Sequence, residues 1–157
     1  MAQVAEKLPE TEAVLPIEPR KFNLPDFDTH GIWLIPRMCE TYPSLSPRSA
    51  ANFLRGILYA NDYKFMFLPN AVALAQTVKD FMLDPMPTVR ERFVWCRDRE
   101  DKIAQVQAAV FYDEFAKWAR WQGCETMIVE ESSDVPHDLI REKLGRVLMR
   151  QQSYVRF

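Results

Sequence analysis

The segment REDKIAQVQAAVFYDEFAKWARWQG, residues 99–123, is the feature that most restricts the possible folds of this chain. Its apolar side chains recur at intervals of three and four and its charged side chains fall opposite them, which is typical of an amphipathic α-helix. Gly123 follows at the position of a helix C-cap. The preceding run ERFVWC, residues 91–96, is strand-like. A strand leading directly into a long helix predicts a sheet with helices packed against it.

The bulk composition excludes several classes of protein. The chain has 157 residues, is 48% hydrophobic and carries a formal net charge of −2 at pH 7. This length suits one domain with its own core, and the charge lacks the basic excess of a dedicated nucleic-acid-binding protein. No apolar stretch approaches the roughly 20 residues that a membrane span requires. Glu6, Lys7 and Glu10 lie where a signal peptide would be apolar, so we expect no secretion by that route.

Cysteine and histidine are too few and too scattered to indicate a metal site. Cys39, Cys96 and Cys124 are far apart with no CxxC pair, and only His30 and His137 could join them. The spacing of zinc ligands is therefore missing. We expect reduced, mostly buried thiols, as in a cytosolic protein, and no bound metal. A catalytic Cys–His pair is left open by the same residues.

Residues 1–29 differ in composition from the rest of the chain. Four prolines and the absence of glycine predict a stiff, extended segment. One interpretation is a disordered acidic tail. The other is an arm that lies across a neighbouring subunit, because a purely solvating tail has little use for large apolar side chains. The candidate contact residues of this arm are Phe22, Leu24 and Phe27.

Residues 30–157 predict one domain in which strands and helices alternate. Ser46 and Pro47 are a helix cap and a first helical residue, and the apolar spacing after them is helical. Short runs of alternating or continuous apolar residues predict the strands. The predicted strands are 31–38, 63–70, 71–83, 88–96, 124–133 and 146–157, and the predicted helices are 46–61, 99–123 and 134–145.

The order of these elements resembles that of the GNAT N-acetyltransferase superfamily. FAKWARWQGCETMIV, residues 115–129, is similar to the family's cofactor-side helix, which ends in glycine and runs into the fifth strand. LIREKLGRVLMRQQSYVRF, residues 139–157, is similar to the family's YEKLGF helix end and its following strand. MCETYPSLSPRSAANFLRGIL, residues 38–58, resembles the first-helix region of divergent members encoded by bacteriophages. The resemblance implies an α+β, three-layer fold with a central mixed, mostly antiparallel sheet flanked by helices.

The cofactor turn of that family is degenerate in this chain. Active members hold the pyrophosphate of acetyl-CoA on a turn whose glycines let the phosphates approach the backbone. The matching residues are 103–108, IAQVQA, where β-branched Val106 would stand in the phosphate path. We therefore expect no cofactor, with acetyl-CoA as the alternative. The degenerate loop residues are Ile103, Ala104, Val106 and Ala108, and the cations that could replace the turn are Arg97, Arg99 and Lys102.

The resemblance also gives few catalytic candidates. Arg141 occupies the position of the tyrosine that often protonates the leaving thiolate, and arginine stays charged near neutral pH. Glu130 and Glu131 are weak candidates for a base at the end of a strand, where such a pair is more often solvated. Tyr154 and Tyr112 are the nearest tyrosines in sequence, but neither occupies the matching position, and Tyr154 is kept as a weak candidate. Acidic residues at the start of the long helix would in addition repel a pyrophosphate; they are Asp98, Glu100 and Asp101.

These departures lead to an expected function. We expect a catalytically inactive GNAT-fold protein that serves as a bacteriophage structural or assembly protein, located in the host cytoplasm or the virion. Its partners would be other protein subunits in a large homo- or hetero-assembly. Trp121 lies off the apolar stripe of its helix and is the candidate interface anchor. The alternative is an active acetyl-CoA-dependent N-acetyltransferase with an atypical cofactor loop and an amine as acceptor.

A third interpretation is weak contact with nucleic acid through the basic C-terminal stretch. Alternation along the last predicted strand would spread these cations over both faces, and a solvated surface explains them adequately. We therefore expect no nucleic-acid partner. The residues concerned are Arg141, Lys143, Arg146, Arg150 and Arg156.

Overall fold

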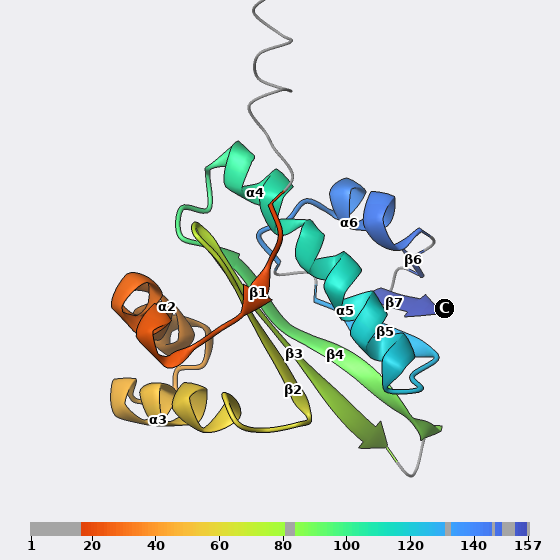
Figure 1. Cartoon of the computed structure of the whole chain (residues 1–157), viewed down its shortest axis with the longest axis horizontal. Helices are drawn as coiled ribbons and strands as arrows, with labels where there is room; N and C mark the ends of the chain where they lie inside the picture. The colour runs from red at the N-terminus through yellow and green to blue at the C-terminus, as the bar shows by residue number, and fades with distance from the viewer. Residues whose placement is uncertain (1–16, 81–83, 131–132, 146, 149–152, 157) are drawn as a thin grey trace, which may run out of the picture.

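The computed structural model describes residues 17–80, 84–130, 133–145, 147–148 and 153–156 (Figure 1). A seven-stranded sheet in the order β1-β2-β3-β4-β5-β7-β6 organises the fold. The strands are β1 (Arg20–Lys21), β2 (Tyr63–Leu68), β3 (Ala71–Asp80), β4 (Asp84–Cys96), β5 (Thr126–Val129), β6 (Val147–Leu148) and β7 (Ser153–Arg156). The helices are η1 (Leu24–Asp26), α2 (Phe27–Thr41), α3 (Pro47–Ile57), α4 (Lys102–Ala108), α5 (Val110–Trp121) and α6 (His137–Leu144).

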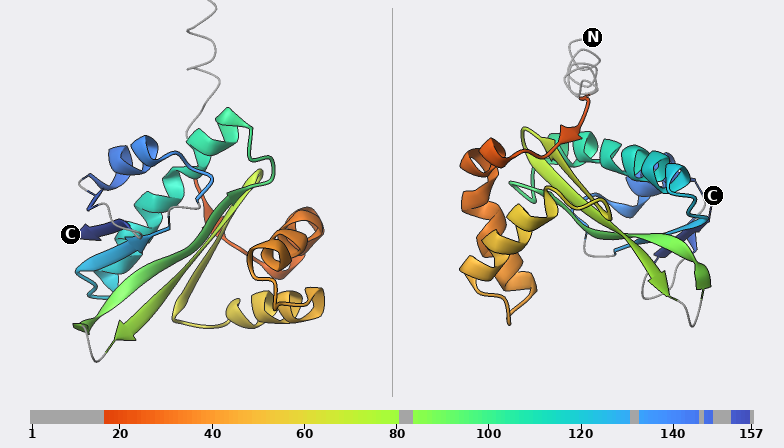
Figure 2. Two further views of the ribbon diagram at one scale, coloured as in Figure 1. Left: turned by 180° about the vertical axis from the view of Figure 1, so that it is seen from behind. Right: turned by 60° about the horizontal axis from the view of Figure 1, so that its bottom comes forward.

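The predicted fold class is confirmed. Only the pairing of β4 with β5 is parallel among the recorded strand pairs. Helices α2 and α3 cover one face of the sheet, and α4, α5 and α6 cover the other, which makes three layers (Figures 1 and 2). Phe111 and Phe115 fill the core under α5, while Leu34 and Leu54 fill the core under α2 and α3. Each such side chain contributes about 1.5–3 kcal/mol relative to an exposed one.

The first predicted strand, residues 31–38, is wrong, because these residues belong to α2. His30, Leu34 and Met38 are buried, whereas Ile32 is 83% exposed. Burial at every fourth residue is helical spacing, and a strand that buries Leu34 would bury Ile32 as well. A short apolar run between glycine and proline does not distinguish a strand from a buried helix by periodicity alone.

The predicted helix over residues 99–123 forms as two consecutive helices, α4 and α5, which meet at Ala109. The first begins at 102 because the carboxylate of Asp101 caps it, accepting the N–H groups of Ile103 and Ala104 at 3.0 and 3.1 Å. Gly123 ends the second with φ 77°, a left-handed conformation that favours glycine. The other predicted helices and strands between residues 46 and 145 are confirmed in type and order. The last predicted strand, 146–157, is divided into β6 and β7.

Residues 17–29 pack against the domain. The β1 pair Arg20–Lys21 bonds antiparallel to Met66 and Phe67 of β2. Phe22 is completely buried, stacked on Phe65 with 4.1 Å between ring centroids. This part of the predicted arm therefore belongs to the core, while residues 1–16 lie outside the described ranges. Within those ranges the helices are too short or too polar to cross a bilayer.

Candidate active site

Strands β4 and β5 separate partway along the sheet. They pair in parallel from Thr88–Thr126 to Arg90–Ile128, and no later pair between them is recorded among the described residues. Strand β4 continues to Cys96 beyond this point. Because β5 ends at Val129, the rest of β4 has no recorded partner strand on this side.

Glu91 lies where the two strands separate, and its side chain is completely buried. The Tyr112 hydroxyl and the Glu130 backbone are the nearest hydrogen-bonding groups, although neither makes a bond of ordinary geometry with the carboxylate. Burial raises the pKa of Glu91 to about 8; the hydroxyl of Tyr112 acts against this rise and the charge of Glu130 adds to it. A carboxyl group with such a pKa exchanges its proton near neutral pH, as a general base or acid must.

Tyr112 reaches the same point from α5 and is also completely buried. Its hydroxyl donates to the Oγ of Ser133 at 2.6 Å, and this Oγ accepts the N–H of Val135 at 3.2 Å. Burial, followed by the negative charge of Glu91, raises the pKa of Tyr112 well above its ordinary value. The phenol therefore stays protonated and can serve as a proton donor beside the Glu91 carboxyl.

A β-bulge in β4 sets which side chains face each side of the sheet. Leu74 of β3 lies opposite Phe93, but Ala75 lies opposite Glu91, so Arg92 is the extra residue. Glu91 consequently faces α5, while Arg92 and Phe93 both line a pocket on the face covered by α2 and α3. The bulge thus turns Phe93 to the same face as Arg92, opposite Glu91.

The end of β4 is bonded to the loop that precedes α6. The backbone N–H of Asp134 donates to the oxygen of Val94 at 3.1 Å, and the N–H of Cys96 donates to Oδ2 of Asp134 at 2.9 Å. The guanidinium of Arg37 donates to both carboxylate oxygens of Asp134. This loop therefore covers the β4 edge beyond the opening.

The predicted cofactor turn at 103–108 is helical, since these residues form most of α4. Ala104 and Ala108 are buried, whereas Ile103 and Val106 are 46% and 41% exposed. Val106 therefore projects partly into solvent from a helix, which replaces the turn assumed from the sequence. The two N–H groups that Asp101 accepts are no longer available to a phosphate, so no glycine-type backbone cradle exists at these residues.

The three cationic candidates near α4 are exposed. The Nη2 of Arg97 donates to the oxygen of Thr29 at 3.0 Å, and Arg99 lies 3.8 Å from a carboxylate oxygen of Glu40. Lys102 has no ion pair within 4.0 Å among the described residues. The role of these side chains in binding a ligand stays a prediction.

The predicted catalytic candidates are only partly described. Glu130 is half-buried and lies 3.4 Å from Nη2 of Arg90, close to the buried carboxyl of Glu91. Glu131 lies outside the described residues. The backbone of Tyr154 pairs with Ile128, and its side chain is outside the description. Their catalytic roles stay predictions.

Sequence reasoning missed Glu91, and it set Tyr112 aside because this residue is outside the matching position. The signal for Glu91 was present in the strand TVRERFVWC, where alternation from Val89 places an acidic residue on a buried face. An acidic residue at an inward position is rarely buried without a function or a partner. Tyr112 gave no such signal, because a tyrosine on the apolar face of a helix is ordinary core.

The predicted interface residues have very different environments. Phe22 is buried, and Phe27 packs edge-on against it at 5.0 Å between ring centroids, so both serve the chain's own core. Leu24 is 53% exposed and Trp121 is 80% exposed. Contact of these two residues with another subunit stays a prediction.

Known structures resemble this fold, although no family model and no curated protein matches the chain. A probable acetyltransferase matches with a TM-score of 0.63 and 13% identity over 86% of this chain and 93% of the other. Glucosamine-6-phosphate N-acetyltransferase from Arabidopsis thaliana matches with a TM-score of 0.62 and 16% identity over 85% and 92%. An aminoglycoside N-acetyltransferase solved in complex with CoA matches with a TM-score of 0.52 and 16% identity over 85% and 92%.

These matches overturn the expected function. The similar structures are acetyltransferases, and nothing in them indicates catalytic inactivity or a role in a bacteriophage particle. The expectation of an inactive virion protein rested on the missing glycine turn, the missing acid tyrosine and the acidic residues at the helix start. The similar structures give it no support. The likeness extends over most of the chain and includes the sheet, the flanking helices and their order. The chain therefore has the fold of the GNAT N-acetyltransferase superfamily.

Proposed function

We propose that this chain is an acetyl-CoA-dependent N-acetyltransferase that transfers an acetyl group to an amine. The observation that carries the proposal is the buried Glu91–Tyr112–Ser133 cluster at the point where β4 and β5 separate. A proton acceptor and a proton donor are both needed when an amine attacks a thioester, and this cluster supplies one of each. The fold, shared with acetyltransferases, supports the same reaction.

Each residue of the cluster has a defined part in the proposed reaction. Acetyl-CoA supplies a thioester that an amine can attack. The carboxylate form of Glu91 takes the proton that the nitrogen loses as the N–C bond forms. The hydroxyl of Tyr112 gives its proton to the sulfur as the C–S bond breaks, and Ser133 orients that hydroxyl. The low dielectric of the buried site strengthens both interactions.

The two ends of acetyl-CoA fit the described residues differently. At the reacting end, Glu91 supplies a buried carboxyl group and Tyr112 a buried hydroxyl beside it. The diphosphate has no backbone cradle at α4, since Asp101 accepts the first N–H groups there. The side chains that would hold it are therefore Arg97, Arg99 and Lys102, which offset the acidic residues beside them.

Thermal unfolding with acetyl-CoA tests the proposal directly. A ligand at a hundred times its dissociation constant adds about 2.7 kcal/mol to the free energy of unfolding, so the melting temperature should rise with acetyl-CoA concentration. Release of free thiol, measured with a panel of amines, should depend on the amine. No shift at millimolar acetyl-CoA, together with no thiol release, would refute the proposal.

Two substitutions connect the activity to the cluster. Glu91→Gln keeps the shape of the side chain but removes the base, and Tyr112→Phe removes the donor. Each should lower kcat by roughly 10²–10⁴-fold, the usual contribution of a positioned proton-transfer group. Lys117→Ala, on the exposed side of α5, is the matched control and should leave kcat unchanged. Equal activity of all three variants would contradict the assigned roles.

A further inference from the structure

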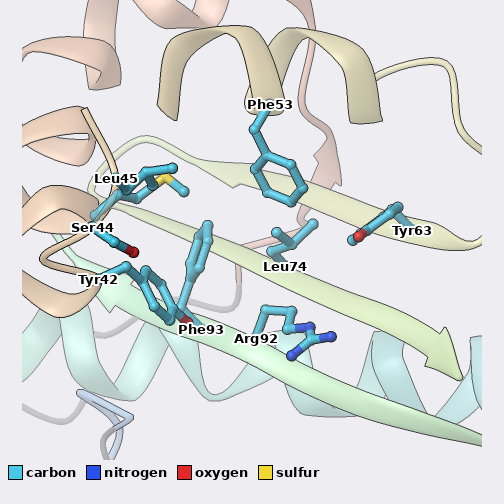
Figure 3. Close-up of a pocket in the computed structure, with 9 residues that line it drawn as sticks. Tyr42, Ser44, Leu45, Phe53, Tyr63, Leu74, Arg92 and Phe93 are labelled. Atoms are coloured by element: carbon cyan, nitrogen blue, oxygen red, sulfur yellow. The ribbon is translucent and has the colours of Figure 1, made fainter. Parts of the chain in front are cut away.

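A pocket of about 370 Å³ lies on the face of the sheet that α2 and α3 cover. Figure 3 shows the residues that line it. It is bounded by α2 and the segment after it, by α3, and by strands β2, β3 and β4. Its volume is at the lower end of the range of roughly 300–1,000 Å³ for small-molecule pockets. The lining includes Leu45, Phe53, Tyr63, Leu74, Arg92 and Phe93. The pocket is therefore small, largely apolar and rich in aromatic rings.

The rings are held in place from both sides of the pocket. Phe53 extends from α3 toward the strands, and Phe93 extends from β4 toward the helix (Figure 3). Phe53 and Tyr63 pack edge to face with 5.8 Å between ring centroids, and Phe93 stacks on Trp95 at 4.3 Å. Fixed aromatic surfaces bind a planar apolar group with little loss of side-chain entropy.

Arg92 supplies the cation in this lining. Its Nε donates to Oε1 of Gln76 at 2.9 Å, and its Nη2 donates to the same oxygen. Gln76 is neutral, and no carboxylate lies within 4.0 Å of the guanidinium among the described residues. A guanidinium has five N–H donors, so most of them stay available for another acceptor.

The positive charge of Arg92 acts on Tyr63, another residue of the pocket lining. Burial raises the pKa of Tyr63, and the nearby positive charge of Arg92 opposes that rise. Arg92 and Tyr63 line the same pocket, and Gln76 fixes the orientation of the guanidinium. A positive charge that is neutralised by no described side chain, set beside aromatic rings, complements an anion on an apolar body.

We propose that this pocket binds a small molecule with a planar apolar group and a carboxylate, the carboxylate being held by Arg92. The β4 bulge is what makes the site, because it turns Arg92 and Phe93 to the same face. The carboxylate accepts hydrogen bonds from the free donors of the guanidinium, while the apolar group lies among Phe53, Leu74 and Phe93. This site is separate from the Glu91 cluster and does not require acetyl transfer.

Calorimetric titration with 3-phenylpropionate, in the absence of acetyl-CoA, tests the proposal. The wild-type chain should bind it on the order of tenfold or more tightly than 3-phenylpropanamide, since hydrogen bonds to a charged group are stronger than neutral ones. Propionate, which lacks the ring, should bind much more weakly. Equal affinity for the acid and the amide, or no binding at millimolar concentration, would overturn the proposal.

Three variants locate the site. Arg92→Gln should abolish the preference for the acid over the amide, whereas Arg55→Gln, on an exposed residue of α3 outside the pocket lining, should keep it. If Arg92→Gln does not fold, Phe53→Ala decides instead, because loss of a lining ring should weaken both ligands and leave their ratio unchanged. Unaltered binding by Phe53→Ala would refute the site. The titrations contain no acetyl-CoA, so their failure leaves the proposed acetyl transfer untouched.

Discussion

Arg37 and Asp134 form a bidentate ion pair at 2.5 Å although they are 97 residues apart in the sequence. Their side chains are only 10% and 8% exposed. The guanidinium also donates to the oxygen of Cys96 at 3.2 Å and lies 4.5 Å from the centroid of the Trp95 ring. The pair thus joins α2, the end of β4 and the loop before α6. These three parts come from distant segments, so the pair is a long-range tie within the domain.

Asp134→Ala should lower the free energy of unfolding by about 3–5 kcal/mol, because it leaves the buried guanidinium of Arg37 without its partner. Urea unfolding measures the change. Lys117→Ala breaks the ion pair between Lys117 and Glu114, in which the lysine side chain is 70% exposed. It should change the free energy of unfolding by less than about 0.5 kcal/mol. A similar effect of the two substitutions would show that burial of the Arg37–Asp134 pair is unimportant.

Phe22→Ala should lower the free energy of unfolding by about 3–5 kcal/mol, the usual cost of removing a buried phenylalanine. The side chain is completely buried and stacks on Phe65. Leu24→Ala removes an exposed apolar residue two positions away and should have little effect. The melting temperatures of the two variants give the comparison. A mild effect at Phe22 would mean that the N-terminal segment is separate from the core.

The stability of the wild-type chain should fall as the pH rises from about 4.5 to about 8, because of Glu91. The folded protein keeps the proton of this carboxyl up to a pKa of about 8, whereas the ordinary value is 4.5. Within this window the unfolded chain binds fewer protons, so the free energy of unfolding decreases by up to about 1.4 kcal/mol per pH unit. Above pH 8 this contribution is lost.

Glu91→Gln removes this titration and is the control for it. Urea unfolding at several pH values should show that the wild type loses stability relative to Glu91→Gln across the window. Above about pH 8, the difference in free energy of unfolding between the two proteins should be constant. Parallel pH profiles for the two proteins would show that Glu91 titrates normally in the folded state.

Asp101→Asn should strengthen acetyl-CoA binding. Asparagine keeps the side-chain oxygen that caps α4 but removes a negative charge where the diphosphate would lie. Repulsion near a partly exposed surface is on the order of 1 kcal/mol per charge, which corresponds to about fivefold in affinity. Lys102→Gln should change the affinity in the opposite direction. Calorimetry measures both, and weaker binding by Asp101→Asn would place the diphosphate elsewhere.

Local patterns in the sequence predicted the elements whose periodicity is clear. The hairpin of β2 and β3 alternates, and α3 has Ser46 as its cap, with the Ser46 Oγ accepting the N–H of Ser49 at 3.1 Å. Residues 31–38 were wrongly predicted as a strand, because a continuous apolar run fits both a strand and one face of a helix. Apolar periodicity depends only on residues close together in the sequence. It therefore identifies a helix or strand better than it identifies what that helix or strand packs against.

The candidate site was less predictable for a related reason. Glu91, Tyr112 and Ser133 come from β4, α5 and the loop after β5, and only the folded sheet brings them together. The bulge at Arg92 shifts the alternation of β4 by one residue, which no pattern in TVRERFVWC reveals. The diphosphate site stays a prediction, because a match of positions does not show which N–H groups the cap residue Asp101 already occupies.

The short pairing of Arg20 and Lys21 with β2 has a consequence for how the protein behaves at high concentration. Without it, the outer side of β2 would present open N–H and C=O groups next to Phe65 and Phe67, a template onto which another molecule could add its own strand. The guanidinium of Arg20 lies over the ring of Phe67 at 3.9 Å and also bonds to Asp26. A chain cut after this segment should consequently form fibrils or precipitates more readily than the full-length chain.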